Sequence, residues 1–148
     1  MTAVTGSVST YTEGRLVLPK EVNLATDTLK ALLLTDSYTP ALSTDTLAGI
    51  TTNECSGAGY SRVTVSGKSV TESSGDILFT FDDIVFTANG SGINNIRYCA
   101  VYDDTLAGDN LLYLIDLTGG SPVNFSITDG NNVTVDLPAA LITLEFSA

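Results

Sequence analysis

The feature that most constrains this chain is the stretch from Asn94 to Leu117, which predicts a β-hairpin. Two β-prone runs, 96–102 and 111–117, flank a loop of Asp, Gly and Asn, residues that favour turns and disfavour strand interiors. In the second run four large apolar residues at spacing two are expected on one face: Leu111, Tyr113, Ile115 and Leu117. The other face is also mostly apolar, through Leu112 and Leu114. A strand apolar on both faces lies centrally in a sandwich or contacts a neighbouring subunit.

The rest of the chain repeats short β-prone runs separated by turn residues. Further strands are predicted at 28–35, 62–65, 77–81, 84–87, 123–128, 133–137 and 141–146. The Asp82-Asp83 pair interrupts the alternation and marks a bulge or tight corner. Asp129-Gly130 predicts a hairpin between its two flanking runs. About eight to ten strands with little helix predict an all-β chain, an antiparallel β-sandwich or barrel-like, jelly-roll-like fold.

The 148 residues divide into an N-terminal segment and one domain. Residues 1–27 are expected to form an extended arm, since the first fourteen lack a sustained apolar period and residues 15–19 are a short apolar patch ending at a proline. Residues 28–148 are expected to form a single β-sandwich domain. Within it, residues 36–60 are a long connection with at most one helical turn near 44–48, and connections of this length are usually functional or ordered by a partner.

The charge distribution argues against nucleic acid as a partner, and the length of the apolar runs argues against a membrane span. The formal net charge is −11, and from Glu72 onwards eleven acidic residues accompany one base, Arg97. Such a surface repels nucleic-acid phosphates, so we expect no DNA or RNA binding. No apolar run approaches the roughly 20 residues of a membrane helix, so we expect no membrane span. Only 16% of residues are charged, against roughly 25% in typical soluble domains, and Thr and Ser are abundant, as suits a surface used for contacts.

The residue types leave little basis for catalysis or a cofactor. The absence of histidine excludes imidazole triads, and two separated cysteines disfavour a zinc site. Reduced thiols are expected, although a Cys55–Cys99 disulfide stays open. Oxygen ligands for calcium are offered by the hairpin loop, through Asp103, Asp104 and Asp109, but their spacing matches no EF-hand and a solvated turn is the favoured interpretation. We therefore predict a protein that is not an enzyme and holds no cofactor.

An ordered series of phrases resembles a group of small tailed-bacteriophage virion proteins. It runs LLLTDSYTP, NECSGAGY, FTFDDIVFTANGSGINNIRYCAVYDDT, LLYLIDL and SITDGNNVTVDLPAALITLEF, and covers roughly residues 30–146. The chain departs from the pattern by Cys99 in the RYCAVYDDT part of the third phrase and by Ile84-Val85-Phe86 where the group has a Trp-containing phrase. The resemblance implies a capsid decoration or cement protein, a homotrimer that bridges subunits of the major capsid protein on the virion surface after synthesis in the host cytoplasm.

The residues independently favour a structural role in which the arm and the 36–60 connection contact neighbouring subunits. The contact residues expected lie in the arm, the connection and the hairpin: Arg15, Leu16, Val17, Leu18, Lys20, Tyr38, Tyr113 and Ile115. Three alternatives stay open. One is a tail, fibre or baseplate-associated protein. The second is a carbohydrate-binding β-sandwich, which normally needs exposed aromatics, and the third is an enzyme working through carboxylates, Tyr, Lys or hydroxyls.

Overall fold

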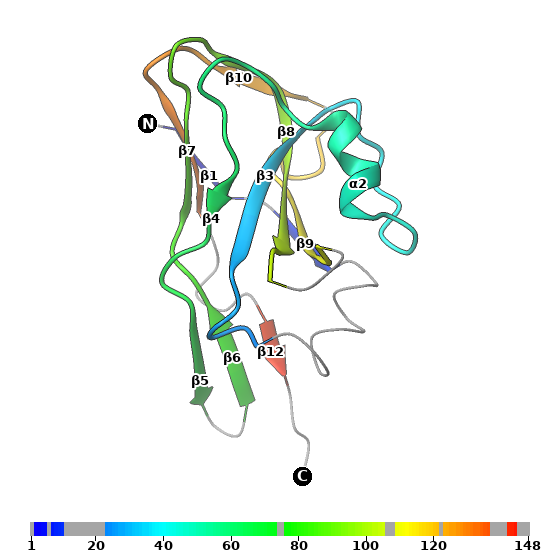
Figure 1. Cartoon of the computed structure of the whole chain (residues 1–148), viewed down its shortest axis with the longest axis vertical. Helices are drawn as coiled ribbons and strands as arrows, with labels where there is room; N and C mark the ends of the chain where they lie inside the picture. Colours follow the sequence, from blue (N-terminus) through cyan, green and yellow to red (C-terminus); the bar gives the residue numbers. More distant parts are fainter. Residues whose placement is uncertain are drawn as a thin grey trace.

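A computed structural model of the chain describes residues 2–5, 7–10, 23–73, 76–105, 109–121, 123–136 and 142–144. Strands dominate these residues (Figure 1), and the all-β prediction is confirmed. In chain order the elements are β1 (Thr2–Thr5), β2 (Ser7–Thr10), β3 (Leu29–Thr35), α2 (Leu47–Ile50), the 3-10 turn η1 (Thr51–Asn53), β4 (Val63–Thr64), β5 (Ser69–Ser73), β6 (Asp76–Thr80), β7 (Ile84–Thr87), β8 (Ile93–Asp103), β9 (Leu111–Asp116), β10 (Phe125–Ile127), β11 (Asn132–Asp136) and β12 (Ile142–Leu144).

The described strands form three sheets. The largest has the order β2-β9-β8-β3-β4, and β10 pairs with the first part of β8. A second sheet has the order β1-β11-β7, and a third has the order β12-β6-β5. Every pair is antiparallel except β1 with β11, which is parallel. The finer expectation of a jelly-roll-like sandwich or barrel stays a prediction.

The predicted hairpin is present as β8 and β9, but a bulge changes which residues share a face. Val101 pairs with Tyr113 and Tyr102 with Leu111, so Leu112 is an extra residue in β9. Tyr113, like the residues at spacing two after it, belongs to one core, whereas Leu111 belongs to the other. The expectation that Leu111 shares the face of Tyr113 is therefore wrong, and so is the expectation that Leu112 shares the face of Leu114, because Leu112 belongs to the main core and period two fails across a bulge.

The central sheet is apolar on both faces, and each face has its own core. The main core joins residues of β3, β8 and β9 to those of β6, β7 and β11, with Leu33, Cys99 and Val133 fully buried. The second core covers the opposite face of β3 and β8 and contains Tyr38, Leu47 and Ile50 from the segment before and within α2. In Figure 1, β7 lies on one side of β3 and β8, and α2 lies on the other. The two-faced strands are thus covered from within the chain.

Part of the long 36–60 connection is the layer that supplies this cover. The Thr46 hydroxyl caps the helix by accepting a hydrogen bond from the Gly49 amide at 3.2 Å. The helical turn expected near 44–48 is observed slightly later, at Leu47–Ile50. Burial of Leu47 and Ile50 against the sheet explains why so short a helix forms at this position, because tertiary packing outweighs local propensity.

Two expectations about turns have different outcomes. The Asp82-Asp83 pair is a corner: β6 belongs to the sheet of β5 and β12, while β7 belongs to the sheet of β11 and β1. Asp129-Gly130 is a turn with Gly130 at φ 76°, but the hairpin predicted there is wrong. β10 pairs with β8, and β11 pairs with β7 and β1. The turn therefore carries the chain from one sheet to another, because turn chemistry specifies a reversal and not the partner of each strand.

The first residues of the expected arm are integrated into the sheets. β1 pairs with β11 and β2 pairs with β9, so residues 2–5 and 7–10 are strands of two sheets, and the division of the chain into an arm and a single domain stays a prediction. Main-chain pairing to distant strands is a tertiary contact that the Thr- and Ser-rich sequence did not indicate. Asn23 to Asp27 form a turn in which the Asp27 amide donates to the Asn23 carbonyl at 2.8 Å.

Candidate functional site

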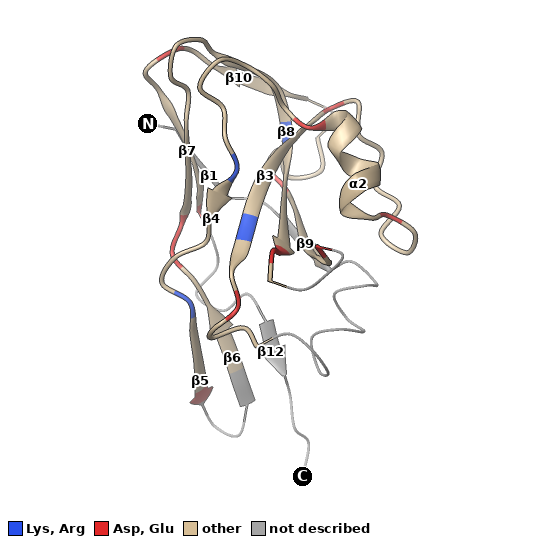
Figure 2. Ribbon diagram, viewed as in Figure 1, with Lys and Arg blue, Asp and Glu red and all other residues tan. Residues whose placement is uncertain are grey.

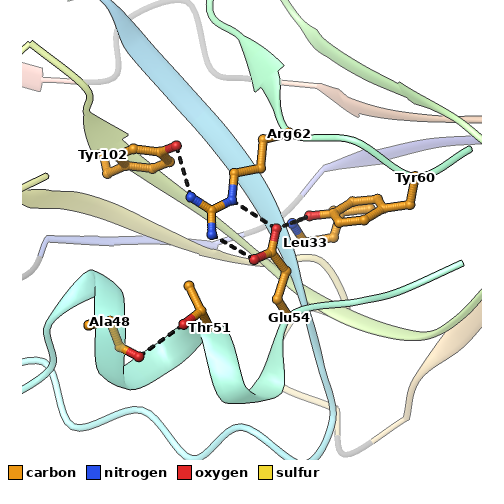
Figure 3. Close-up of polar contacts among 7 residues, drawn as sticks. All are labelled: Leu33, Ala48, Thr51, Glu54, Tyr60, Arg62 and Tyr102. Atoms are coloured by element: carbon orange, nitrogen blue, oxygen red, sulfur yellow. Dashed lines mark hydrogen bonds and ion pairs between the residues drawn. The ribbon is translucent and has the colours of Figure 1, made fainter.

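The densest group of polar side chains in the described residues is the Arg62 network, made of Glu54, Tyr60, Arg62 and Tyr102 (Figure 3). Arg62 Nε donates to Glu54 Oε1 at 2.9 Å, and its Nη2 donates to Oε2 at 2.8 Å. Its Nη1 donates to the Tyr102 hydroxyl at 3.1 Å. The Tyr60 hydroxyl donates to Glu54 Oε1 at 2.9 Å and accepts from the Leu33 amide at 2.9 Å. Both oxygens of the carboxylate are therefore used within the network.

The network ties an irregular segment to the central sheet. Glu54 follows η1 and forms an isolated antiparallel bridge with Leu34 of β3, and the Cys55 amide donates to the Leu33 carbonyl at 2.9 Å. Arg62 precedes β4, at the sheet edge, and Tyr102 lies in β8. A fork-to-fork Arg–carboxylate pair fixes both distance and orientation. It holds the two ends of the 54–62 segment together over β3.

Burial and charge agree on the state of these groups. Burial raises the pKa of Tyr60 well above its ordinary value, the Leu33 amide opposes this, and the Glu54 carboxylate adds to it. The hydrogen bond with Glu54 raises the pKa of Arg62, partial burial opposes this, and the bond with Tyr102 adds to it. Arg62 is thus charged and Tyr60 neutral across the physiological range. In this state every donor and acceptor described above has its partner. The network is therefore suited to stabilising the fold.

The three described aspartates of the predicted hairpin loop, Asp103, Asp104 and Asp109, do not form a common metal site. Asp104 forms an ion pair with Lys30 at 2.7 Å, and Asp103 Oδ1 accepts from the Thr105 amide at 2.7 Å. Asp109 has a positive φ of 47° in the turn before β9. Within the part of the chain that the structure describes, no three His, Cys, Asp or Glu side chains form a metal-binding group. The calcium candidate is therefore not supported by this arrangement.

The predicted contact residues that the structure describes are buried inside the chain. Tyr113 and Ile115 belong to the main core, each 1% exposed. Tyr38 belongs to the second core, where its ring packs edge-on against Tyr98 with centroids 5.5 Å apart and its hydroxyl donates to Asp45 Oδ2 at 2.6 Å. These three side chains hold the fold together and are not presented to a partner. The other predicted contacts fall outside the described residues: Arg15, Leu16, Val17, Leu18 and Lys20.

The basic side chains of the described residues all make contacts within the chain. Besides Lys30 and Arg62, Lys68 donates to the Asp27 carbonyl. Arg97 lies 4.9 Å from the Tyr98 ring centroid and 4.0 Å from Asp116 Oδ2. Figure 2 shows acidic positions distributed over loops and strand ends, with basic positions few and separate. Each described positive charge thus has a contact within the chain, while the Lys30 and Arg62 side chains stay 34% and 32% exposed.

The two cysteines are buried and unpaired with each other. Both thiols are free, and both lie in the main core. Burial, with Glu54 and Asp36 adding to it, raises the pKa of Cys55 to about 12, and burial raises the pKa of Cys99 above its ordinary value. The expectation of reduced thiols is confirmed, and the disulfide that stayed open is not formed.

Three loops contact one another near β10, and they contain residues 58–59, 89–91 and 129. The Ser91 hydroxyl donates to the Ala58 carbonyl at 3.2 Å, and the Gly90 amide donates to Asp129 Oδ1 at 2.7 Å. Gly59 has φ +87°, and a Cβ placed there would lie 1.6 Å from the Asn89 carbonyl oxygen. Only glycine fits so close an approach between two backbones. The GAGY part of the NECSGAGY phrase is therefore explained by backbone packing, and the Glu54 part by the Arg62 network.

Residue patterns alone did not reveal the Arg62 network. Glu54 and Arg62 are eight residues apart in a segment with no period, and Tyr102 is forty residues further along. The single available signal was the NECSGAGY phrase of the resemblance, which contains Glu54 and Tyr60 without indicating their partners.

Comparison of the chain with protein-family models, with curated proteins and with solved structures found no match. In the described part of the chain, no helix has the length and apolar character needed to cross a membrane.

Proposed function

We propose that this chain is a non-enzymatic structural protein of a tailed-bacteriophage virion. In this role it decorates the capsid surface as a homotrimer and stabilises the shell by bridging subunits of the major capsid protein. The observation that carries the proposal is the structural position of the resembling phrases. They coincide with β3, the Glu54-to-Tyr60 segment, β7 with β8, and β9.

These phrases make the framework of the molecule. β3, β8 and β9 are the central strands, and the Arg62 network fastens the Glu54-to-Tyr60 segment onto them. A resemblance concentrated in framework elements supports a shared fold, because it falls on groups that hold the structure together, and the shared mechanical role is an analogy at the level of the fold. It supports a rigid building block that withstands load while its outer loops make contacts.

The character of the surface supports a protein partner. The described basic side chains are few and each contacts another group of the chain, so the described surface offers a partner mainly acidic groups, hydroxyls and backbone. Many weak contacts repeated around a lattice then give firm attachment by avidity, with pair interfaces of about 1,600 Å². Partner patches that are basic or uncharged fit such a surface, and nucleic acid does not.

The test is the solution mass of the purified protein, measured by light scattering, followed by co-sedimentation with capsid shells built from a candidate major capsid protein. We expect a stable trimer that sediments with the shells at saturable stoichiometry. Shells of an unrelated capsid protein are the control for adhesion to any protein surface. A monomer that stays in the supernatant with every candidate shell would contradict the proposal and favour a tail or fibre component or a free-standing binding module.

A further inference from the structure

The N-terminal strands complete two different sheets. β1 lies at the edge of the sheet β1-β11-β7, and β2 lies at the edge of the central sheet next to β9. The registers are Thr2 with Val133 to Thr5 with Asp136 in the first pair, and Ser7 with Asp116 to Thr10 with Tyr113 in the second. One residue separates the two strands, so nine residues in a row span two sheets.

The body of the molecule builds both acceptor edges without this segment. β11 pairs on its other side with β7, and β9 pairs on its other side with β8. β1 and β2 are then added through main-chain hydrogen bonds, the mode by which an extended segment extends an open sheet edge. Main-chain bonds do not depend on which copy of the chain supplies the segment, so the segment of a second copy fits the same edges equally well.

The distance that the chain must cover after β2 follows from the registers. Thr10 pairs with Tyr113, Tyr113 with Val101, and Val101 with Ala31, so Thr10 is level with the start of β3 and three strands away from it. At about 4.8 Å between neighbouring strands, the lateral separation is about 14 Å. Four or five residues are enough to bridge that distance.

The chain supplies many more residues than this. Eighteen residues lie between Thr10 and Leu29. The last six are held to the body, where the Thr28 amide donates to Thr105 Oγ1 at 2.7 Å and Lys68 donates to the Asp27 carbonyl. The remaining twelve, residues 11–22, can span up to about 40 Å when extended. That reach is nearly three times the lateral separation between Thr10 and the start of β3, so this length of chain allows the segment to pair with its own copy or with a neighbouring one.

We infer that residues 2–10 form an exchangeable segment that one copy of this chain inserts into the β11 and β9 edges of a second copy. Closed and exchanged forms contain the same strand pairs, so their balance depends on chain entropy and on the local concentration of copies. A tethered segment competes for the edges of its own copy at an effective concentration in the millimolar range, so exchange is expected where copies reach a comparable local concentration. The inference concerns pairing between copies and does not require that the partner shell of the proposed function exists.

The test uses two variants of the full chain that each add one cysteine to the native two, Ser9→Cys and Leu114→Cys, at positions that are register partners across β2 and β9. Ser9 is exposed, whereas the native thiols are buried with raised pKa values, so the thiol of Ser9→Cys reacts in preference to them. Leu114 is 3% exposed, so the thiol of Leu114→Cys is reached across the β2–β9 register. One variant carries nitrogen-15, both are mixed at about 1 mM and oxidised gently, and intact masses are measured without reductant. We expect a disulfide-linked dimer containing one light and one heavy chain, which accumulates with time.

The matched control is the pair Ser69→Cys and Thr80→Cys, register partners in β5 and β6 that are joined within a short local segment. We expect the mixed light–heavy dimer from the β2–β9 pair to exceed that from the control pair by at least about tenfold. A second pair, Thr5→Cys with exposed Asp136→Cys, tests the other sheet and decides the matter if Leu114→Cys does not fold. Mixed dimers no more abundant than in the control would overturn the inference, whatever the outcome of the shell experiment.

Discussion

At the scale of single residues, the Arg62 network joins a bidentate ion pair to two tyrosine hydroxyls. Its Arg–carboxylate pair is bidentate, with Arg62 32% and Glu54 16% exposed, whereas the Lys30 and Asp104 side chains are 34% and 30% exposed, so the difference lies in the geometry and in the burial of the carboxylate. Geometry and burial distinguish an ion pair that holds structure from one that is screened by water.

Replacing Glu54 by Gln should therefore destabilise the protein. The variant keeps the shape of the side chain but removes its charge, which leaves the Arg62 guanidinium without its counter-ion and forces one amide hydrogen toward a donor. We expect a loss of about 1–2 kcal/mol in the free energy of unfolding, measured by urea denaturation. Asp104→Asn, in the exposed pair, is the matched control and should lose much less. Equal losses in both variants would contradict the structural role of the network.

The stability of the protein should fall at alkaline pH because of its buried thiols. Burial raises the pKa of Cys55 from its ordinary 9.0 to about 12. Between these values the unfolded chain releases the thiol proton and the folded chain retains it, so the native state binds more protons and stability falls as pH rises. Each such group contributes a slope of up to about 1.4 kcal/mol per pH unit. Urea denaturation from pH 8 to 11 measures the decline.

Cys55→Ala supplies the control for this pH dependence. Its small apolar side chain fits the site of the buried thiol and has no proton to lose, so the decline above pH 9 should become shallower while Cys99 keeps its share. An unchanged slope would mean that Cys55 ionises in the folded protein as readily as in the unfolded chain.

At the scale of elements, the loops near β10 depend on close backbone contact. Gly59→Ala should be strongly destabilising, by at least about 2–4 kcal/mol, because φ is +87° and the new Cβ would overlap the Asn89 carbonyl. Gly119→Ala is the matched control, since φ is +65° there and nothing lies within 4 Å of the added Cβ. It should lose about 1 kcal/mol, from backbone strain alone. Thermal denaturation of the two variants separates steric overlap from strain.

The short helix α2 should be needed to cover the central sheet. Ile50 is 1% exposed in the second core, so Ile50→Asp would bury an unpaired charge or force α2 away from β3 and β8. We expect a loss of about 3–5 kcal/mol and increased binding of a hydrophobic dye to the uncovered face. Ala48→Asp, at an exposed position of the same helix, should change neither measurement appreciably. Dye binding that stays at the level of the unmodified protein in Ile50→Asp would show that α2 is not the cover.

At the scale of the whole molecule, the N-terminal segment determines whether two sheet edges are paired. Deleting residues 1–10 should leave the edges of β9 and β11 open, lower the unfolding temperature and increase self-association, because unpaired edges bind other strands. A synthetic peptide of residues 1–12, added in excess, should reverse both effects, and a scrambled peptide of the same composition should not. A truncated chain that remains monomeric and equally stable would mean that the segment contributes no essential pairing.

Much of the local structure was predictable because its causes are local. Alternation and turn residues located β3, β7, β8 and β9, and the Asp82-Asp83 corner was recognisable from a change of parity. The misplaced face of Leu111 had a cause that alternation cannot reveal, since one bulged residue in β9 inverts every assignment on one side of it. The candidate site was harder still, because Glu54, Arg62 and Tyr102 meet only after β3, β4 and β8 have paired.

The sequence by itself determined that this chain is all-β and that β9 would be apolar on both faces, because side-chain period and turn chemistry depend on neighbouring residues. Only the tertiary structure decided what covers those faces and which strands pair. It placed Tyr38, Leu47 and Ile50 over the second face, directed β10 and β11 to different sheets, and added β1 and β2 to two edges. The physical reason is that an open strand edge or an apolar face accepts any complementary segment. The competition among all segments of the chain, and not the local pattern of any one of them, selects the partner.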